Sequence, residues 1–84
     1  MKVREHITRK LKNLEESGST IFKTSDIQEL SFEGRNQFGK FLGSTETYTR
    51  EFRRMRTDGV IMVEKLDRKG RQQIWKLNKI NFYK

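Results

Sequence analysis

Residues 38–61 read FGKFLGSTETYTREFRRMRTDGVI, and this stretch contains the pattern that decides the fold. Ser44 suits a helix N-cap, because its hydroxyl can accept a hydrogen bond from an N–H group of the first helical turn. Three apolar residues then recur at helical spacing: Tyr48, Phe52 and Met55. We therefore predict a helix over about residues 45–57, which the Asp-Gly pair at positions 58 and 59 ends.

The face of this predicted helix opposite the apolar stripe is cationic. On a helical wheel at about 100° per residue, three arginines point away from the stripe: Arg50, Arg53 and Arg54. Arg56 falls on the flank. A solvated helix face normally mixes both signs of charge, whereas only Glu46 and Glu51 offset these four arginines. The pattern therefore favours a surface that binds an anionic partner.

The chain before this stretch begins with a second amphipathic pattern. Four apolar residues form one stripe: Val3, Ile7, Leu11 and Leu14. They predict a helix over about residues 2–17, with Gly18 as a left-handed C-cap. STIFKT (19–24) then predicts a brief strand.

The segment between this strand and the cationic helix predicts two short helices. Ser25 followed by Gln28 fits a capping box, so we expect a helix over about residues 25–30. SFEG (31–34) is expected to be a break. A helix of about two turns should then run from Arg35 to Gly43, with three residues on its buried face: Phe38, Phe41 and Leu42.

The chain after the cationic helix predicts a β-hairpin. VIMVEKL (60–66) and RQQIWKL (71–77) are rich in strand-forming residues, and DRKG (67–70) suits a type I turn between them. Four basic residues lie at or near the tip: Lys65, Arg68, Lys69 and Arg71. Three residues that follow are expected to pack back onto the domain or to form a dimer contact: Ile80, Phe82 and Tyr83.

Three ring side chains are assigned structural roles. Tyr48 and Trp75 could stack on nucleobases, but their places on apolar stripes favour the core. His6 is the only histidine of the chain, and we expect it to be solvated or half-buried with no catalytic or metal-binding role.

The length of the chain and its charge distribution limit the number of domains and the kind of partner that we expect. The chain has 84 residues and a net charge of +8, which predicts one small domain over residues 1–84. Residues 1–34 carry six basic and six acidic side chains, whereas residues 35–84 carry thirteen basic and five acidic ones. The whole positive excess therefore lies in the second part, where an anionic polymer would bind.

Several classes of function lack the motifs they need. The sequence has no Cys, no His cluster and no GxxxxGK loop, so we expect no enzyme activity, no metal site and no cofactor. No stretch suggests a pocket for a small-molecule effector. No apolar run reaches the length of a membrane span or resembles a signal peptide. We therefore expect a cytoplasmic protein without membrane contact, associated with the nucleoid if it is bacterial, archaeal or phage-encoded.

The order of these elements, together with FGKFLGSTETYTREFRRMRTDGVI (38–61), resembles the winged helix-turn-helix family. The matching features are an apolar helix, a Leu-Gly-Ser turn, a Thr- and Arg-rich recognition helix and an Asp-Gly-Val-Ile entry into the wing. The resemblance implies an α+β fold with three or four short helices and a C-terminal β-hairpin wing. An additional helical segment (25–30) and a short wing depart from the family pattern.

The resemblance also implies double-stranded DNA as the partner of a monomer or homodimer, and a role as a small transcriptional regulator. The recognition helix (45–57) would enter the major groove, which admits one α-helix, and the wing (65–71) would contact the backbone or the minor groove. The residues expected to contact DNA are Lys40, Ser44, Thr45, Thr47, Thr49, Arg50, Arg53, Arg54, Arg56, Arg68, Lys69 and Arg71. Two alternatives stay open, namely a winged-helix module that docks a protein and a module that binds RNA.

Overall fold

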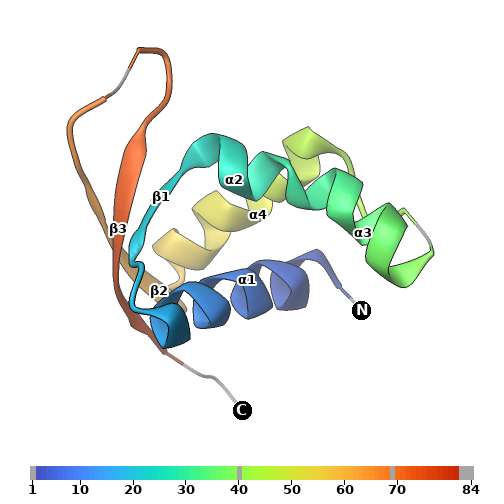
Figure 1. Cartoon of the computed structure of the whole chain (residues 1–84), viewed down its shortest axis with the longest axis horizontal. Helices are drawn as coiled ribbons and strands as arrows, with labels where there is room; N and C mark the ends of the chain where they lie inside the picture. Colours follow the sequence, from blue (N-terminus) through green and yellow to red (C-terminus); the bar gives the residue numbers. More distant parts are fainter. Residues whose placement is uncertain (1, 40, 69, 82–84) are drawn as a thin grey trace.

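The computed structural model describes residues 2–39, 41–68 and 70–81. These residues form four helices and three strands in the chain order α1–β1–α2–α3–α4–β2–β3 (Figure 1). The helices span Val3–Ser17 (α1), Thr24–Gln28 (α2), Leu30–Phe38 (α3) and Thr45–Thr57 (α4). The strands span Ile21–Lys23 (β1), Ile61–Lys65 (β2) and Ile74–Ile80 (β3). The fold is therefore α+β, as predicted.

The three strands form one antiparallel sheet in the order β1-β3-β2. β2 and β3 make a hairpin in which Lys65 lies opposite Trp75. The register shifts between Met62 and Val63, so that Asn78 of β3 has no partner residue on β2. β1 pairs with the other edge of β3 through only three residues, which ties the segment after α1 to the hairpin.

The core lies where α1 and α4 pack on one face of the sheet. Phe52 of α4 is 2% exposed, and its ring meets those of Phe22 and Trp75 edge to face, with centroids 5.8 and 5.4 Å apart. Ile7 and Leu11 of α1 are fully buried in the same cluster. These contacts join β1, β3, α1 and α4 into one apolar unit, which places α4 at a fixed position beside the hairpin.

Two predicted helices are confirmed: α4 has the predicted bounds, and α1 begins one residue later than predicted. α1 ends at Gly18, whose φ of 80° is the left-handed conformation that glycine adopts without strain. α4 begins after Ser44, whose Oγ accepts a hydrogen bond from the Thr47 N–H at 3.2 Å. Its predicted stripe of Tyr48, Phe52 and Met55 is buried.

The predicted break at SFEG (31–34) is wrong, because α3 runs through this segment. Gly34 is buried there, and a Cβ added to it would lie 3.5 Å from the Tyr48 hydroxyl. This is an ordinary van der Waals distance, and Gly34 has no positive φ, so neither packing nor backbone conformation breaks the helix at this glycine. The predicted helix from Arg35 to Gly43 is wrong as well, since residues 41–44 have no helical structure and Phe41 is 56% exposed.

Smaller differences concern the ends of α2 and β3. The predicted capping residue Ser25 lies inside α2, and it is Asp26 that caps, with its Oδ2 accepting from the Lys23 N–H at 2.9 Å. β3 begins at Ile74 and extends to Ile80, which is 7% exposed and packs into the core as expected. Lys69 of the predicted turn (67–70) lies outside the described residues. Phe82 and Tyr83, which were expected to pack onto the domain or to form a dimer contact, lie outside them as well.

His6 is more deeply buried than predicted. It is 4% exposed, and its Nδ1 lies 2.7 Å from the Tyr48 hydroxyl, so the pair joins α1 to α4. Burial lowers the pKa of His6, and the charge of Arg9 lowers it further, while Glu33 acts in the opposite direction. Its role in the fold is therefore structural.

Candidate nucleic-acid interface

The outward face of α4 carries the arginines that the sequence predicted to point there. Arg50, Arg53 and Arg54 are all exposed. A shallow hollow on this face is lined by Glu46, Thr49, Arg50 and Arg53. Within the described residues, neither Arg50 nor Arg53 lies within 4.0 Å of a carboxylate oxygen. Their charges are therefore available to a ligand.

Arg4 of α1 removes acidic charge from this face. Its Nε lies 2.6 Å from Glu51 Oε1, and a terminal nitrogen of its guanidinium lies 3.1 Å from Asp58 Oδ2. The hydrogen bond to Glu51 is the largest of the effects that raise the pKa of Arg4. The other oxygen of Glu51, Oε2, lies 4.0 Å from a terminal nitrogen of Arg54, so Arg4 and Arg54 share this carboxylate. Glu46, the other acidic residue of α4, lines the hollow on the outward face.

The hydroxyl groups at the start of α4 are partly engaged within the helix. Ser44 Oγ and Thr47 Oγ1 lie 3.0 Å apart, and Thr49 Oγ1 donates to the Thr45 carbonyl at 3.0 Å. Gln28 Nε2 of α2 donates to Thr49 Oγ1 at 3.4 Å. Ser44 and Thr45 are exposed, and Thr47 and Thr49 are half-buried. These bonds fix the side chains and leave oxygen lone pairs that can accept from a ligand.

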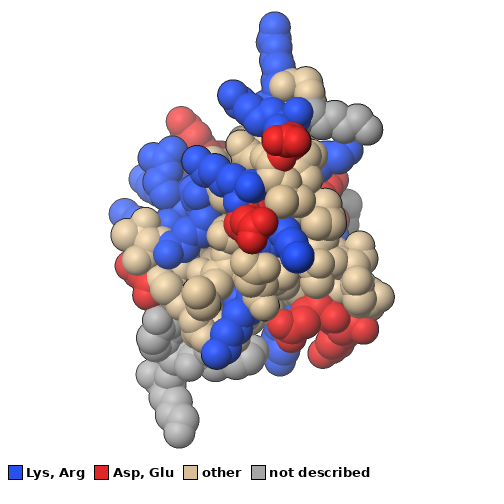
Figure 2. Space-filling view, turned by 90° about the vertical axis from the view of Figure 1, so that its left-hand side faces the viewer, with Lys and Arg blue, Asp and Glu red and all other residues tan. Residues whose placement is uncertain are grey.

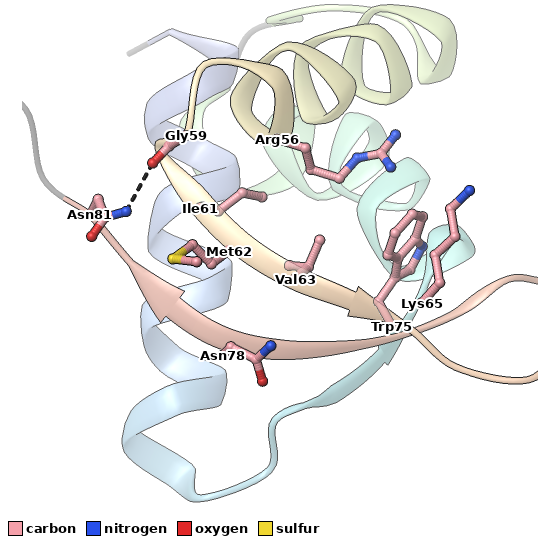
Figure 3. A pocket seen from close by; sticks show the side chains of 9 residues that line it. All are labelled: Arg56, Gly59, Ile61, Met62, Val63, Lys65, Trp75, Asn78 and Asn81. Atoms are coloured by element: carbon pink, nitrogen blue, oxygen red, sulfur yellow. Dashed lines mark hydrogen bonds between the residues drawn. The ribbon is translucent and has the colours of Figure 1, made fainter.

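Arg56 does not project with the other arginines of α4. Its guanidinium carbon lies 4.5 Å from the centroid of the Trp75 indole and 5.1 Å from the centroid of the Phe52 ring. Such cation–π contacts contribute about 0.5 to 2 kcal/mol. Figure 3 shows the side chain lying along the hairpin, beside Trp75 and Lys65. Arg56, which was predicted to lie on the flank of the helix, therefore lies between α4 and the sheet.

The hairpin extends the cationic surface beyond α4. Lys65, Arg68 and Arg71 are exposed, whereas Lys40 and Lys69 lie outside the described residues. Figure 2 shows basic side chains over the upper left of the molecule and at the projecting hairpin at the top, and acidic side chains at the lower right. On the face in view, basic side chains thus gather toward the top and the upper left, with some acidic side chains among them.

Side-chain hydrogen bonds fix the hairpin to α2. Trp75 Nε1 donates to Thr24 Oγ1 at 2.9 Å, and Gln72 Oε1 accepts from the Ser25 N–H at 3.1 Å. Gln73 Nε2 donates to the carbonyl of Leu66 at 2.6 Å across the hairpin. These bonds, together with the core contacts of α4, hold the basic residues of α4 and of the hairpin at fixed positions relative to one another.

Two residues of the candidate interface, Arg4 and Lys65, were not predicted from the sequence to contribute to it. Arg4 is distant in sequence from the acids that it neutralises, and no local pattern marks such a pair. Lys65 was placed near the hairpin tip but left out of the expected DNA contacts, although its Nζ lies 5.9 Å from the Trp75 ring that also holds Arg56. The alternation of side chains along β2 puts Lys65 on the face that Trp75 occupies, and this periodicity was the available signal.

The described residues contain no group of three or more His, Cys, Asp or Glu side chains that could hold a metal ion. Among the helices of the same residues, none is both long and apolar enough to cross a membrane. No family model matches the chain, and neither a curated protein nor a solved structure is similar enough to count as a relative.

Proposed function

We propose that this protein binds double-stranded DNA as a winged helix-turn-helix module, with α4 in the major groove and the β2–β3 hairpin on the backbone or in the minor groove. The element order and the sheet order β1-β3-β2 are compatible with that layout. The observation that supports the proposal most is the outward face of α4, where three arginines are exposed and one of the two acids of the helix is bound by Arg4.

The geometry suits a groove rather than a flat surface. A single α-helix fits the major groove of B-DNA, and the apolar face of α4 is docked in the core while its arginines point outward. Ser44, Thr45 and Arg50 lie toward the N-terminal end, where base edges would be reached, whereas Arg53 and Arg54 lie further along and suit phosphates. Specificity would thus be partial, as in a small transcriptional regulator.

A protein-docking role has weaker support. Phe32 and Phe41 are 64% and 56% exposed, which suits an apolar contact. Ile80, which would have contributed to a C-terminal docking patch, is 7% exposed and is part of the core. The positive charge carried by residues 35–84, with exposed basic residues on α4 and on the hairpin, favours a nucleic acid over such a partner.

The salt dependence of binding tests this function. If five to seven cations neutralise phosphates of a DNA duplex, log K should fall with log salt at a slope of about −4.5 to −6. A slope shallower than about −2 would mean that too few phosphates are engaged, and the protein-docking role would replace DNA binding. The change Arg9→Gln serves as the control, because it removes one exposed positive charge from α1 and should leave the slope unchanged.

A competing RNA duplex separates DNA from RNA. The major groove of A-form RNA is deep and narrow, so α4 could not enter it. We therefore expect DNA of the same sequence to displace the protein from labelled DNA at a lower concentration than RNA does. Equal competition by both duplexes would contradict entry of α4 into the major groove.

A further inference from the structure

Arg56 is held in place without a counter-ion. Its Nε is buried and has no hydrogen-bond partner among the described residues, while its guanidinium lies over the rings of Trp75 and Phe52. The cation–π contacts hold the guanidinium in place but use none of its N–H donors, so the donors of its terminal nitrogens remain for a ligand. The two rings thus orient the Arg56 side chain, but its Nε–H group has no hydrogen-bond partner among the described residues.

A comparison with Arg4 shows what Arg56 lacks. Arg4 contacts the carboxylates of Glu51 and Asp58, and the Glu51 bond raises its pKa. For Arg56, burial lowers the pKa and the charge of Arg53 lowers it further. No carboxylate oxygen of the described chain lies within 4.0 Å of Arg56. The charge of Arg56 is therefore balanced by no group described in the protein.

A second cation from another element lies beside the same ring. Lys65 stands opposite Trp75 in the hairpin register, and its Nζ lies 5.9 Å from the centroid of the indole. Arg56, Lys65 and Trp75 line one open hollow of about 510 Å³ between α4 and the hairpin. Figure 3 shows the two cationic side chains converging beside the ring. The site therefore offers two positive charges from two elements.

We infer that Arg56 and Lys65, supported by Trp75, form a preorganised site for one phosphate group at the junction of α4 and the hairpin. A guanidinium edge binds a phosphate through two parallel N–H···O bonds, and an ammonium group adds a compact charge. Because stacking already orders Arg56, binding costs less side-chain entropy there than at a freely rotating arginine. The inference rests on the proposed function, which identifies the phosphate as one of the DNA backbone.

Trp75 makes the site observable on its own. It is the single tryptophan of the chain, so its fluorescence reports changes at this place and not at the outward face of α4. We expect sodium pyrophosphate and a short DNA duplex each to change Trp75 fluorescence in the wild-type protein. Arg56→Gln and Lys65→Gln should reduce the change, whereas the remote Arg9→Gln should leave it intact. Thermal unfolding of each variant would verify that it is folded.

Binding to the duplex supplies the second measurement. Arg56→Gln should weaken DNA binding about tenfold and make the salt slope shallower by about 0.9, the contribution of one phosphate contact. Arg56→Lys keeps the charge but loses the planar fork, so its affinity should fall between those of the wild type and of Arg56→Gln. If Arg56→Gln does not fold, Lys65→Gln and Arg56→Lys still carry the test.

The outcomes separate this site from the function as a whole. If the wild type binds duplex DNA with the expected slope while Arg56→Gln and Lys65→Gln bind equally well, the phosphate site is refuted and the function stands. If the wild type does not bind DNA, the function is refuted. In that case the pyrophosphate titration tests the phosphate site by itself. A change in Trp75 fluorescence that depends on Arg56 would support a site for free phosphate groups, and the absence of any change would refute the site.

Discussion

The two faces of α4 differ in chemistry and in what they contact. The inward face presents Tyr48, Phe52 and Met55, each 0 to 2% exposed, to α1 and the sheet. The outward face presents Arg50, Arg53 and Arg54 to solvent. Changes on the inward face should therefore alter the free energy of unfolding, and changes on the outward face should alter binding. In this helix of thirteen residues, the side chains that stabilise the fold are therefore separate from those that we propose to bind DNA.

The largest effect is expected on the inward face. Phe52→Ala should cost about 3 to 5 kcal/mol of unfolding free energy, because it leaves a cavity between α4 and the sheet. A domain typically has about 5 to 15 kcal/mol in total, so the variant should be close to unfolding at room temperature. Denaturant titration followed by circular dichroism would measure the loss. A cost below about 1 kcal/mol would show that the ring is not part of the core.

An effect of intermediate size is expected on the outward face. Arg50→Ala, Arg53→Ala and Arg54→Ala should each weaken duplex binding by about 1 to 3 kcal/mol, as loss of a base or phosphate contact does. The free energy of unfolding should change by no more than about 0.5 kcal/mol, as for most surface substitutions. Fluorescence anisotropy with a labelled duplex and denaturant titration would measure the two quantities separately.

The matched control for these variants is Glu46→Gln, which removes the remaining acid from the same face. Its affinity for DNA should equal or slightly exceed that of the wild type, since a negative charge near the phosphates is lost. Wild-type affinity in all three arginine variants would break the comparison between the two faces, because the outward face would then have no role in binding.

The smallest effect concerns the hydrogen bond between Tyr48 of the inward face and His6 of α1. Because burial lowers the pKa of His6, the unfolded chain binds a proton at a higher pH than the folded protein does. The stability that neutral His6 provides is therefore present above about pH 6.5, the ordinary pKa of histidine, and is lost as the pH falls below it. Thermal unfolding between pH 7.5 and 5.5 should show a falling midpoint.

His6→Gln sharpens this test, since glutamine can hydrogen-bond to Tyr48 but does not titrate in this range. Its unfolding midpoint should change less with pH than that of the wild type. DNA affinity should depend little on pH over the same window, because His6 is buried in the core and does not lie on the outward face. An equal pH dependence in both proteins would mean that another group titrates on unfolding.

Local patterns were sufficient to predict α1, α4 and the hairpin. In α4 the cap at Ser44, the apolar stripe and the glycine after Asp58 all indicate the same bounds, and the wheel placed Arg50, Arg53 and Arg54 outward. Agreement between independent local signals is what makes such a segment predictable. The α+β class followed from these elements.

Features that depend on tertiary packing were not predictable in this way. SFEG (31–34) suggested a break, but Gly34 lies inside α3, where it is buried beside Tyr48 and His6. Phe41 suggested a buried helix face, yet it lies outside any helix and is exposed. The stacking of Arg56 on Trp75 and the bridging of Glu51 by Arg4 join residues that are distant in sequence. None of these contacts leaves a periodic signal in the chain.

The central position of β3 has a consequence for how the protein forms. β3 comes after β1 and β2 in the chain but lies between them in the sheet, as Figure 1 shows, so neither earlier strand has a neighbour before it is made. The hydrogen bond from Trp75 to Thr24 alone spans 51 positions. Contacts of such long range slow folding, and in a nascent chain Phe52 would lack its contact with Trp75, and β1 its partner strand, until residues 74–80 leave the ribosome. We therefore expect folding to follow the synthesis of β3 rather than to accompany that of the helices.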